Sequence, residues 1–469
     1  MRPVLLIDFG STYTKVTAVD LDGELILGTA TSLTTASTDI GIGLEAAVAR
    51  LEEKTGRLDY VSRRACSSAA GGLGMMVSGL VPELTAQAAK EAALGAGARI
   101  RRIFSYELSR RDLAEIEAEP PDIFLLTGGT DGGNRDCIIG NAGKLAGLTC
   151  RFPLILAGNR SAVDECENLL ADFPLTVCPN VMPRLGQLNI EPVQKEIRSL
   201  FLSHIVGARG LTRTQELLSG ILMPTPSAIL SAMNLLSRGT SGEEGLGDLL
   251  AVDVGGATTD VYSIGSGQPD EANIIVKGLE EPLAKRTVEG DIGVRHSIPG
   301  IVEEAGLERL ACDSGLEAGQ IEDLIHGLSV GRPLQEGQED LLCRLDHALA
   351  AAAVEAATRR HAGKLEEVYT PMGLTWMQTG KNLRLFRQLI LTGGALVHAS
   401  HPLDIARRAL YDDSFPRSLR PYQVEVFLDK GYILSAMGVL AESEPDKALR
   451  IIKKELTGLG PCGRRPGQE

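Results

Sequence analysis

An aspartate followed by a glycine turn rich in hydroxyls occurs twice in this chain, about half its length apart. The first copy covers residues 8–15 and the second covers residues 253–260. In each copy an apolar run ends in the aspartate, the glycine turn follows, and a second β-prone run begins. Such a turn can receive a polyphosphate, because its backbone N–H groups face the space above the strand end and glycine lacks the Cβ that would block a phosphate.

The side chains of the two turns predict separate tasks at such a ligand. The carboxylates of Asp8 and Asp253 would repel phosphate, so we expect them to hold a divalent cation or its waters, as in a magnesium site. Lys15 can place a positive charge at the phosphates, and the hydroxyls can add hydrogen bonds. The candidate phosphate-binding residues of the two turns are Gly10, Ser11, Thr12, Lys15, Gly255, Gly256, Thr258 and Thr259.

A second motif, a strand ending in Thr-Gly-Gly, is also duplicated and follows each aspartate at a similar distance. It occupies Thr127, Gly128 and Gly129 in the first half, and residues 392–394 in the second. The absence of side chains at Gly393 and Gly394, followed by the small Ala395, leaves room for a flat base and a ribose. Two copies of one ordered pair of motifs therefore predict two similar lobes that share one nucleotide, ATP or ADP.

Some acidic residues near these motifs have two interpretations. Asp131 follows the first Thr-Gly-Gly turn and could orient an attacking water, or it could be an Asx-turn residue of a glycine loop. Glu289 and Asp291 flank Gly290 and could approach the γ-phosphate or the magnesium ion, or they could belong to a polar loop. With Asp8 and Asp253, Asp131 completes the candidate catalytic set.

The elements that must position these motifs follow an α/β pattern. The chain opens as three short strands joined by turns, unlike a Rossmann unit, whose glycine turn leads directly into a helix. From residue 123 to residue 178 strands alternate with helices, which predicts a parallel sheet covered by helices. The second half repeats the plan, with strands expected at residues 249–253, 260–264, 272–276, 388–391 and 423–427.

Composition excludes several classes of protein. The chain has 469 residues, enough for two or three domains, and a net charge of −14 without a basic run, which argues against nucleic-acid binding. Its eight cysteines contain no C-x-x-C pair, so neither a metal cluster nor a redox pair is predicted. No apolar stretch reaches the length of about 18 residues that spans a bilayer. We therefore expect a cytoplasmic protein with no membrane contact.

These ordered motifs resemble those of the actin, sugar kinase and heat-shock chaperone ATPase superfamily. The resemblance implies an α/β fold with two duplicated actin-like, or ribonuclease H-like, lobes and a nucleotide cleft between them. It also implies that residues 8–15 form phosphate loop one, residues 127–131 connect one, residues 253–259 phosphate loop two and residues 393–395 the adenosine loop. Lys15 stands where actin-like members carry a phosphate-contacting lysine.

The same resemblance predicts the domain plan. Residues 1–246 would form lobe I with an inserted helical region, and residues 247–430 would form lobe II. Residues 431–457 would form a C-terminal helix that returns to lobe I. Residues 458–469 are rich in Gly, Pro and charge, which predicts a disordered tail.

Further motifs lie at residues 66–74, 94–98, 130–134, 223–226 and 288–293. Together they resemble those of a narrower family, the GlmL/MutL family, which is unrelated to the DNA-repair protein of the same short name. It implies an accessory ATPase, a slow one, that reactivates an adenosylcobalamin-dependent mutase such as glutamate mutase and contacts the mutase subunits. Two alternatives stay open: a small-molecule kinase of the same fold, and a non-catalytic ATP-binding scaffold. A homodimer also stays open.

Overall fold

The chain forms two compact units, each described by itself below. The computed structural model describes residues 1–10, 12–35, 40–68, 73–207, 220–332, 338–371 and 373–463. Unit 1 comprises Met1–Ala232, Gly278–Glu280 and Leu434–Ile451, and unit 2 comprises Met233–Lys277, Glu281–Ile433 and Ile452–Glu469. The division therefore falls inside helix α8 (Thr225–Arg238), before the expected boundary at residue 246.

Unit 1 begins with a mixed sheet, here called sheet 1, in the order β10-β4-β1-β2-β3. β1 pairs antiparallel with β2 and parallel with β4, so the turn after β1 and the carboxyl end of β4 lie at the same edge. Helix α1 (Ile40–Thr55) packs its apolar side on this sheet, and α15 (Leu434–Ala441) contacts β1 and β4. The strands of sheet 1 are β1 (Pro3–Phe9), β2 (Tyr13–Asp20), β3 (Leu25–Leu33), β4 (Ser62–Ser67) and β10 (Ile221–Pro224).

A second sheet of unit 1, here called the insert sheet, is wholly parallel and has the order β6-β5-β7-β8-β9. It separates β4 from β10 in sequence, and its order is that of a doubly wound flavodoxin-like fold. Its strands are β5 (Gly74–Gly79), β6 (Arg99–Ser105), β7 (Ile123–Leu126), β8 (Leu154–Leu156) and β9 (Leu175–Val177).

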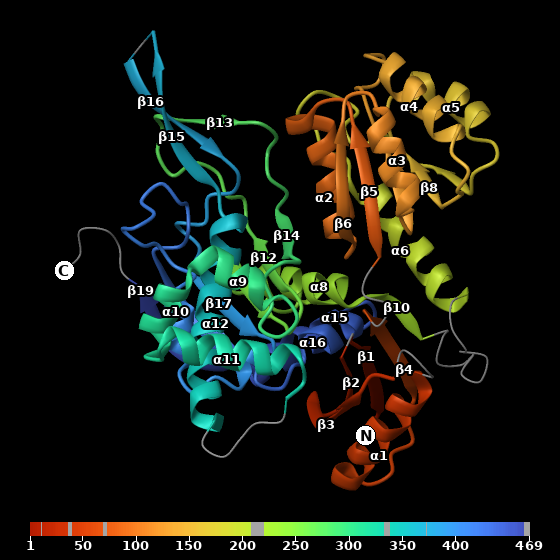
Figure 1. Cartoon of the computed structure of the whole chain (residues 1–469). Helices are drawn as coiled ribbons and strands as arrows, with labels where there is room; N and C mark the ends of the chain where they lie inside the picture. The colour runs from red at the N-terminus through yellow and green to blue at the C-terminus, as the bar shows by residue number, and fades with distance from the viewer. Residues whose placement is uncertain are drawn as a thin grey trace. The chain divides into compact units, whose positions relative to one another are not determined.

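Helices cover both faces of the insert sheet, as Figure 1 shows. One face packs against α2 (Gln87–Gly95) and α6 (Glu191–Gly207) through the alanines of α2. The other face packs against α3 (Arg110–Ala118), α4 (Asp136–Ala146) and α5 (Val163–Leu169). The alternation predicted for residues 123–178 corresponds to β7, α4, β8, α5 and β9. Two short helices, η1 (Pro82–Ala86) and η2 (Arg160–Ala162), complete the insert.

Unit 2 is built on sheet 2, with the order β14-β12-β11-β17-β18-β19. As in sheet 1, the first strand, β11, pairs antiparallel with the next strand and parallel with a later one, β17. Its strands are β11 (Leu249–Val254), β12 (Thr259–Ile264), β14 (Ala284–Glu289), β17 (Gln388–Thr392), β18 (Gln423–Leu428) and β19 (Thr457–Gly463).

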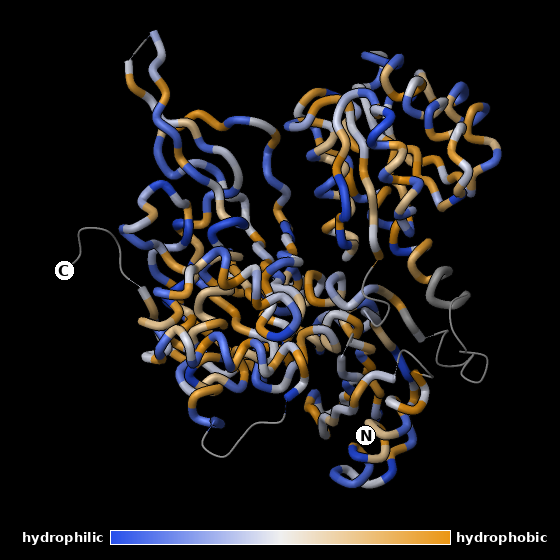
Figure 2. Tube along the Cα trace, in the orientation of Figure 1, coloured by the Kyte–Doolittle hydropathy of each residue, from blue (hydrophilic) through white to orange (hydrophobic). Residues whose placement is uncertain are grey.

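The core of unit 2 lies between this sheet and the helices that follow β14. The small residues of α12 let it contact β11, β12 and β14 closely, and α10 packs against α12 (Figure 1). Hydrophobic residues follow the strands and inner helix faces, whereas hydrophilic residues follow the outer turns (Figure 2). The helices are α9 (Ile298–Ala305), α10 (Leu307–Ser314), α11 (Ala318–Ser329), α12 (Gln338–His361), α13 (Gly394–Val397) and α14 (Pro402–Arg407).

A small sheet in the order β13-β16-β15 extends from the rest of unit 2. It consists of β13 (Ile274–Lys277), β15 (Lys364–Thr370) and β16 (Gly373–Thr379). Ile274, Leu365 and Leu419 form its own small core, against which Trp376 packs. No strand was predicted between residues 276 and 388, so this hairpin was missed.

The C-terminal part of the chain differs from its prediction. Instead of one helix over residues 431–457, α15 and α16 (Pro445–Glu455) are separate helices, and α15 belongs to unit 1. The disordered tail expected from Gly458 was wrong for its first part, because β19 pairs antiparallel with β18 up to Gly463. Glycine and proline fit an edge strand, which pairs on one side only. Among the described residues no helix is both long and apolar enough to cross a bilayer.

The predicted fold class is confirmed by the strand orders. Sheets 1 and 2 contain the same five strands in the same order, with β1, β2, β3, β4 and β10 corresponding to β11, β12, β14, β17 and β18. The first strand of each lies centrally, antiparallel to the second and parallel to the fourth. The chain is thus an α/β protein with two duplicated ribonuclease H-like units.

Candidate nucleotide site

The turn after β1 is closed by one backbone hydrogen bond. Gly10 N–H donates to the carbonyl oxygen of Tyr13 over 3.1 Å. A Cβ on Gly10 would lie 2.6 Å from that oxygen, so the turn requires glycine here. Thr12 is exposed on the turn, and Ser11 lies outside the described residues. Lys15 pairs with Asp8 across the β1–β2 ladder, which places both side chains at the base of the turn.

The carboxylate of Asp8 is buried and held by two hydroxyls. Its Oδ1 accepts a hydrogen bond from Thr225 Oγ1 over 2.6 Å, and its Oδ2 accepts one from Ser435 Oγ over 2.9 Å. These donors begin α8 and α15, so three distant segments of unit 1 fix one side chain. Each carboxylate oxygen has two lone pairs, so Asp8 can still face a cation or its water shell. The next strand places Cys66 beside Asp8, and burial raises the pKa of that thiol well above its usual value.

The turn after β11 repeats this backbone geometry. Gly255 N–H donates to the carbonyl oxygen of Thr258 over 2.9 Å, and a Cβ on Gly255 would lie 3.0 Å from that oxygen. Gly255 therefore corresponds to Gly10, and Asp253 to Asp8. Gly256 follows in the turn, where its backbone carbonyl accepts hydrogen bonds from the N–H groups of Arg295 and His296.

The Thr-Gly-Gly turn after β17 packs directly on Asp253. Gly393 has φ +93°, and a Cβ there would lie 2.5 Å from Asp253 Oδ1, so only glycine fits. Gly394 begins α13, and its nearest neighbour is the Tyr432 hydroxyl. Burial, with further contributions from Asp253 and Asp429, raises the pKa of Tyr432 to about 12, so its hydroxyl is protonated at neutral pH. Ala395 follows in α13 and is partly buried.

In unit 2, Thr259 and the carboxylates of Glu289 and Asp291 make contacts other than the phosphate or magnesium contacts considered from the sequence. Thr259 is fully buried and its hydroxyl donates to the Ile292 carbonyl over 3.0 Å, so it supports the turn from beneath. Arg360 Nη1 pairs with Glu289 over 2.9 Å and with Asp291 over 3.0 Å. That ion pair places Glu289 and Asp291 in a polar network rather than leaving them as separate carboxylates.

The first Thr-Gly-Gly turn is not the counterpart of the second, contrary to the sequence interpretation. β17 corresponds to β4 in sheet 1, whereas Thr127 directly follows β7 of the insert sheet. The Thr127 hydroxyl donates to the Ser78 carbonyl over 2.6 Å, inside the insert sheet. In register, Cys66 stands beside Asp8 as Thr392 stands beside Asp253, so the counterpart turn starts at Ser67.

The glycine loop after β7 is organised by its own hydrogen bonds. Asp131 Oδ1 accepts from Arg160 N–H over 3.0 Å and from Asn180 Nδ2 over 2.9 Å. These hydrogen bonds support the second interpretation of Asp131, as a residue that shapes the glycine loop. Gly128 and Gly129 both have positive φ, and a Cβ on Gly129 would lie 2.1 Å from a backbone oxygen. The sequence signal that could have found the counterpart is the Ser-rich stretch from Ser67, whose residues 69–72 lie outside the described residues.

Each of the two turns supplies one carboxylate, which is enough for magnesium only when phosphate oxygens complete the ligand set. Among the described residues no cluster of three or more His, Cys, Asp or Glu side chains could hold a metal by itself. Magnesium is commonly bound by one or two carboxylates together with waters and phosphate oxygens. Asp8 and Asp253 each supply one carboxylate at a phosphate-type turn, which is the donor chemistry that such a complex needs.

Two sheets of one order, each with an aspartate–glycine turn after its first strand, define the class of duplicated ribonuclease H-like proteins that includes actin, sugar kinases and heat-shock chaperone ATPases. Within that class, this chain belongs to the MutL protein family, whose sequence model matches residues 4–456. The Protein MutL of Clostridium tetanomorphum is 45% identical over 463 residues, which cover 97% of this chain and 99% of that protein. The predicted family is confirmed.

Solved structures also resemble this chain over nearly its whole length, at low identity. The activator of the 2-hydroxyisocaproyl-CoA dehydratase from Clostridium difficile with bound ADPNP is 12% identical, covers 96% of this chain and 97% of its own, and has a TM-score of 0.31. Glycerol dehydratase reactivase is 10% identical, covers 94% of this chain and 100% of its own, and has a TM-score of 0.36. Likeness at this level says nothing about what this chain binds.

Proposed function

We propose that this chain is an ATP-binding accessory factor that reactivates an adenosylcobalamin-dependent mutase, such as glutamate mutase. The observation that carries the nucleotide part is the repeated turn. In each copy a glycine N–H donates to a carbonyl three residues later, after a strand whose penultimate residue is aspartate. Membership of the MutL family, together with the mutase association that this family implies, supports the choice of partner.

In this proposal the turns of residues 8–15 and 253–259 bind the phosphates of ATP or ADP. Backbone N–H groups of the turn glycines, the Thr12 and Thr258 hydroxyls and the Lys15 ammonium would contact phosphate oxygens. Magnesium, when bound, would neutralise phosphate charge, and Asp8 and Asp253 would hold it or its waters. Gly393, Gly394 and Ala395 would receive the adenosine. Slow hydrolysis of ATP would then change the affinity for the mutase.

The compartment and the assembly follow from the same proposal. All eight cysteines are free thiols, which suits the reducing conditions of the cytoplasm. The mutase subunits are the expected partners, and the cobalamin is expected to stay with the mutase. A homodimer is retained as an arrangement to be tested by mass measurement in solution.

A reactivation assay tests the proposal. An inactivated cobalamin-dependent mutase is incubated with this protein, ATP, magnesium and fresh adenosylcobalamin, and mutase turnover is followed. We expect recovery of activity that requires ATP and is lost with Asp253→Ala, while Asp404→Ala, an exposed carboxylate of the same unit, retains it. ATP-dependent phosphorylation of a metabolite without reactivation would overturn the proposal in favour of a kinase.

A further inference from the structure

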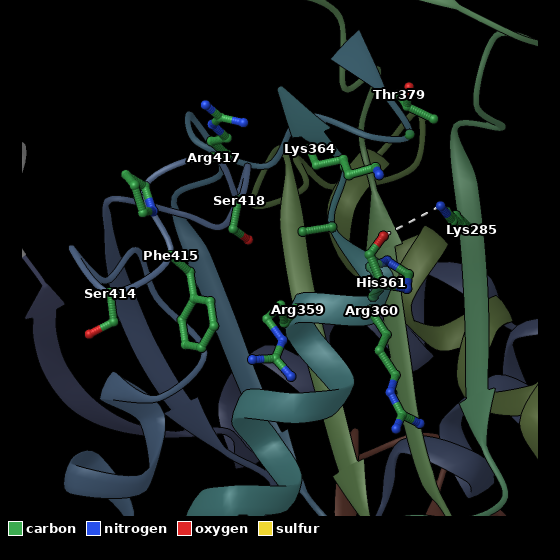
Figure 3. Close-up of a pocket in the computed structure, with 14 residues that line it drawn as sticks. Lys285, Arg359, Arg360, His361, Lys364, Thr379, Ser414, Phe415, Arg417 and Ser418 are labelled. Atoms are coloured by element: carbon green, nitrogen blue, oxygen red, sulfur yellow. Dashed lines mark hydrogen bonds between the residues drawn. The ribbon is translucent and has the colours of Figure 1, made fainter. Parts of the chain in front are cut away.

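A cavity of about 660 Å³ lies in unit 2, at the C-terminal end of α12 (Figure 3). Its walls come from β14, the C-terminal end of α12, the base of the β15–β16 hairpin and the loop of residues 414–418. Cavities of this size accommodate small molecules. In the ladder, Lys285 pairs with Ser263, whereas Glu289 pairs with Thr259 at the turn. Four residues of strand separate the two ends by about 13 Å.

The lining is strongly basic, although the chain as a whole carries a net charge of −14. Among the described residues no carboxylate lines the cavity, but five cationic side chains do. Carboxylates just outside the lining pair with all five cations, so an anion would bind here by replacing some of those partners. The five are Lys285, Arg359, Arg360, Lys364 and Arg417.

Carboxylates from outside the lining partner these cations, and they do so unequally. Arg359 pairs with Glu304, and Arg360 pairs with Glu289, Asp291 and Glu304. Lys285 pairs with Glu281 over 2.9 Å, and both side chains are largely buried. By contrast, Lys364 Nζ lies 2.7 Å from a Glu366 oxygen, and Lys364 is 62% exposed. Arg417 Nη2 lies 3.5 Å from Glu367 and is equally exposed. Exposed pairs contribute little, so Lys364 can exchange its partner for a ligand, as can Arg417.

A buried hydroxyl without a partner also faces this cavity. Ser418 is 8% exposed, and its Oγ makes no hydrogen bond to any described residue. Figure 3 shows this hydroxyl pointing toward Arg359 and His361. Its backbone is fixed, because Ser418 N–H donates to the Phe415 carbonyl over 3.0 Å and the residue bridges to β15. A buried polar group of this kind is stabilised when a ligand supplies the missing hydrogen bond.

We propose that this cavity binds the phosphate groups of a small, multiply charged phosphorylated molecule. Arginine and lysine side chains are the usual ligands of phosphate, and several of them around one cavity favour more than one negative charge. The Ser418 hydroxyl adds a neutral donor. The lining comes from four segments of one unit, which favours an enclosed small molecule over an extended peptide. None of the lining residues belongs to the aspartate–glycine turns, although Arg360 pairs with Glu289, which lies opposite Thr259 of the second turn.

Calorimetric titration of the full chain with pyrophosphate, in the presence of ADP to occupy any nucleotide site, tests this proposal. We expect saturable binding that the double variant Lys364→Glu with Arg417→Glu weakens by at least about tenfold. Ser418→Ala should weaken it by a smaller factor. The matched control, Arg407→Glu with Lys454→Glu, makes the same charge change at exposed positions of unit 2 outside the lining and should bind as the parent does.

The proposal would be overturned if pyrophosphate did not bind the parent chain, or if the parent and the Lys364/Arg417 variant bound it equally. Sulfate binding as tightly as pyrophosphate would also overturn it, because the cavity would then be a general cationic patch. ADP affinity is measured separately on the same proteins, so failure of the nucleotide proposal and failure of this one are distinguishable.

Discussion

The two aspartate–glycine turns have the same backbone but different side-chain partners. In unit 1 the carboxylate of Asp8 accepts two hydrogen bonds from hydroxyls, and Lys15 stands opposite it on β2. In unit 2 the carboxylate of Asp253 packs against Gly393, and Asp260 stands opposite it on β12. The duplication therefore preserves the hydrogen bond that closes the turn, while the charge next to the aspartate changes sign.

That change of sign has a structural consequence in unit 2. Asp260 accepts a hydrogen bond from Arg286 Nε over 2.8 Å, and both side chains are largely buried. Burial alone would lower the pKa of Arg286, but the charge of Asp260 raises it on balance, so the guanidinium stays charged. The position that offers a cation in unit 1 thus holds a buried ion pair in unit 2. The two turns therefore share their backbone geometry, but the residue opposite the aspartate is a lysine in unit 1 and a member of a buried ion pair in unit 2.

The largest expected effect comes from removing the buried ion pair between Asp260 and Arg286. Asp260→Ala removes the carboxylate that pairs with the buried Arg286 and should lower the free energy of unfolding of unit 2 by about 3–5 kcal/mol. The fluorescence of Trp376, the only tryptophan of the chain, reports unfolding of that unit. The corresponding substitution in unit 1, Lys15→Met, should leave this transition unchanged; an equal loss from both variants would contradict the comparison.

A smaller effect should separate the two glycines of the turn after β17. Gly393→Ala places a Cβ 2.5 Å from Asp253 Oδ1 at a φ of +93°, and should cost about 1–3 kcal/mol of stability. Gly394→Ala meets nothing closer than 3.6 Å and serves as the matched control. Thermal unfolding of the two variants gives the comparison. Equal transition temperatures of the two variants would contradict the close packing of Gly393 against Asp253.

The smallest expected effect is an acid sensitivity specific to unit 2. His361 is fully buried between the Ser263 and Thr287 hydroxyls, and burial, then Lys285 and Lys381, lowers its pKa well below 6.5. Unfolding lets it bind a proton, so unit 2 loses stability as pH falls below about 6.5, by at most about 1.4 kcal/mol per pH unit. His361→Gln should flatten that slope in Trp376 fluorescence, and an unchanged slope would refute the assignment.

The sequence was sufficient for the parts of the fold that have strong local signals. The strands beside both aspartates are apolar runs that end at a glycine turn, and β7, β8 and β9 are bounded by prolines. β4 was missed because Ser62–Ser67 carries two arginines. Arg64 is accommodated by a hydrogen bond to Ser443, a partner more than 300 residues away that no local pattern reveals. β10 is short and ends in Pro224, which is tolerated at an edge.

Missing those two strands also caused the error at the site. Without β4 and β10 the Thr-Gly-Gly turn after β7 looked like the counterpart of the one after β17, since both follow apolar strands. Strand order shows that β7 belongs to an inserted sheet with its own core. Similar motifs indicate similar local geometry, but only their place in a sheet shows whether they are equivalent.

The central proposal is that the two turns together bind one nucleotide, with Asp8 and Asp253 holding its magnesium ion or the waters of that ion. Calorimetric titration with ADP and magnesium tests it most directly, on the parent chain and on Asp8→Asn and Asp253→Asn. The account predicts one ADP per chain, with the affinity reduced at least about tenfold in each variant. Two ADP per chain, each lost separately with one aspartate, or affinities unchanged in both variants, would contradict it.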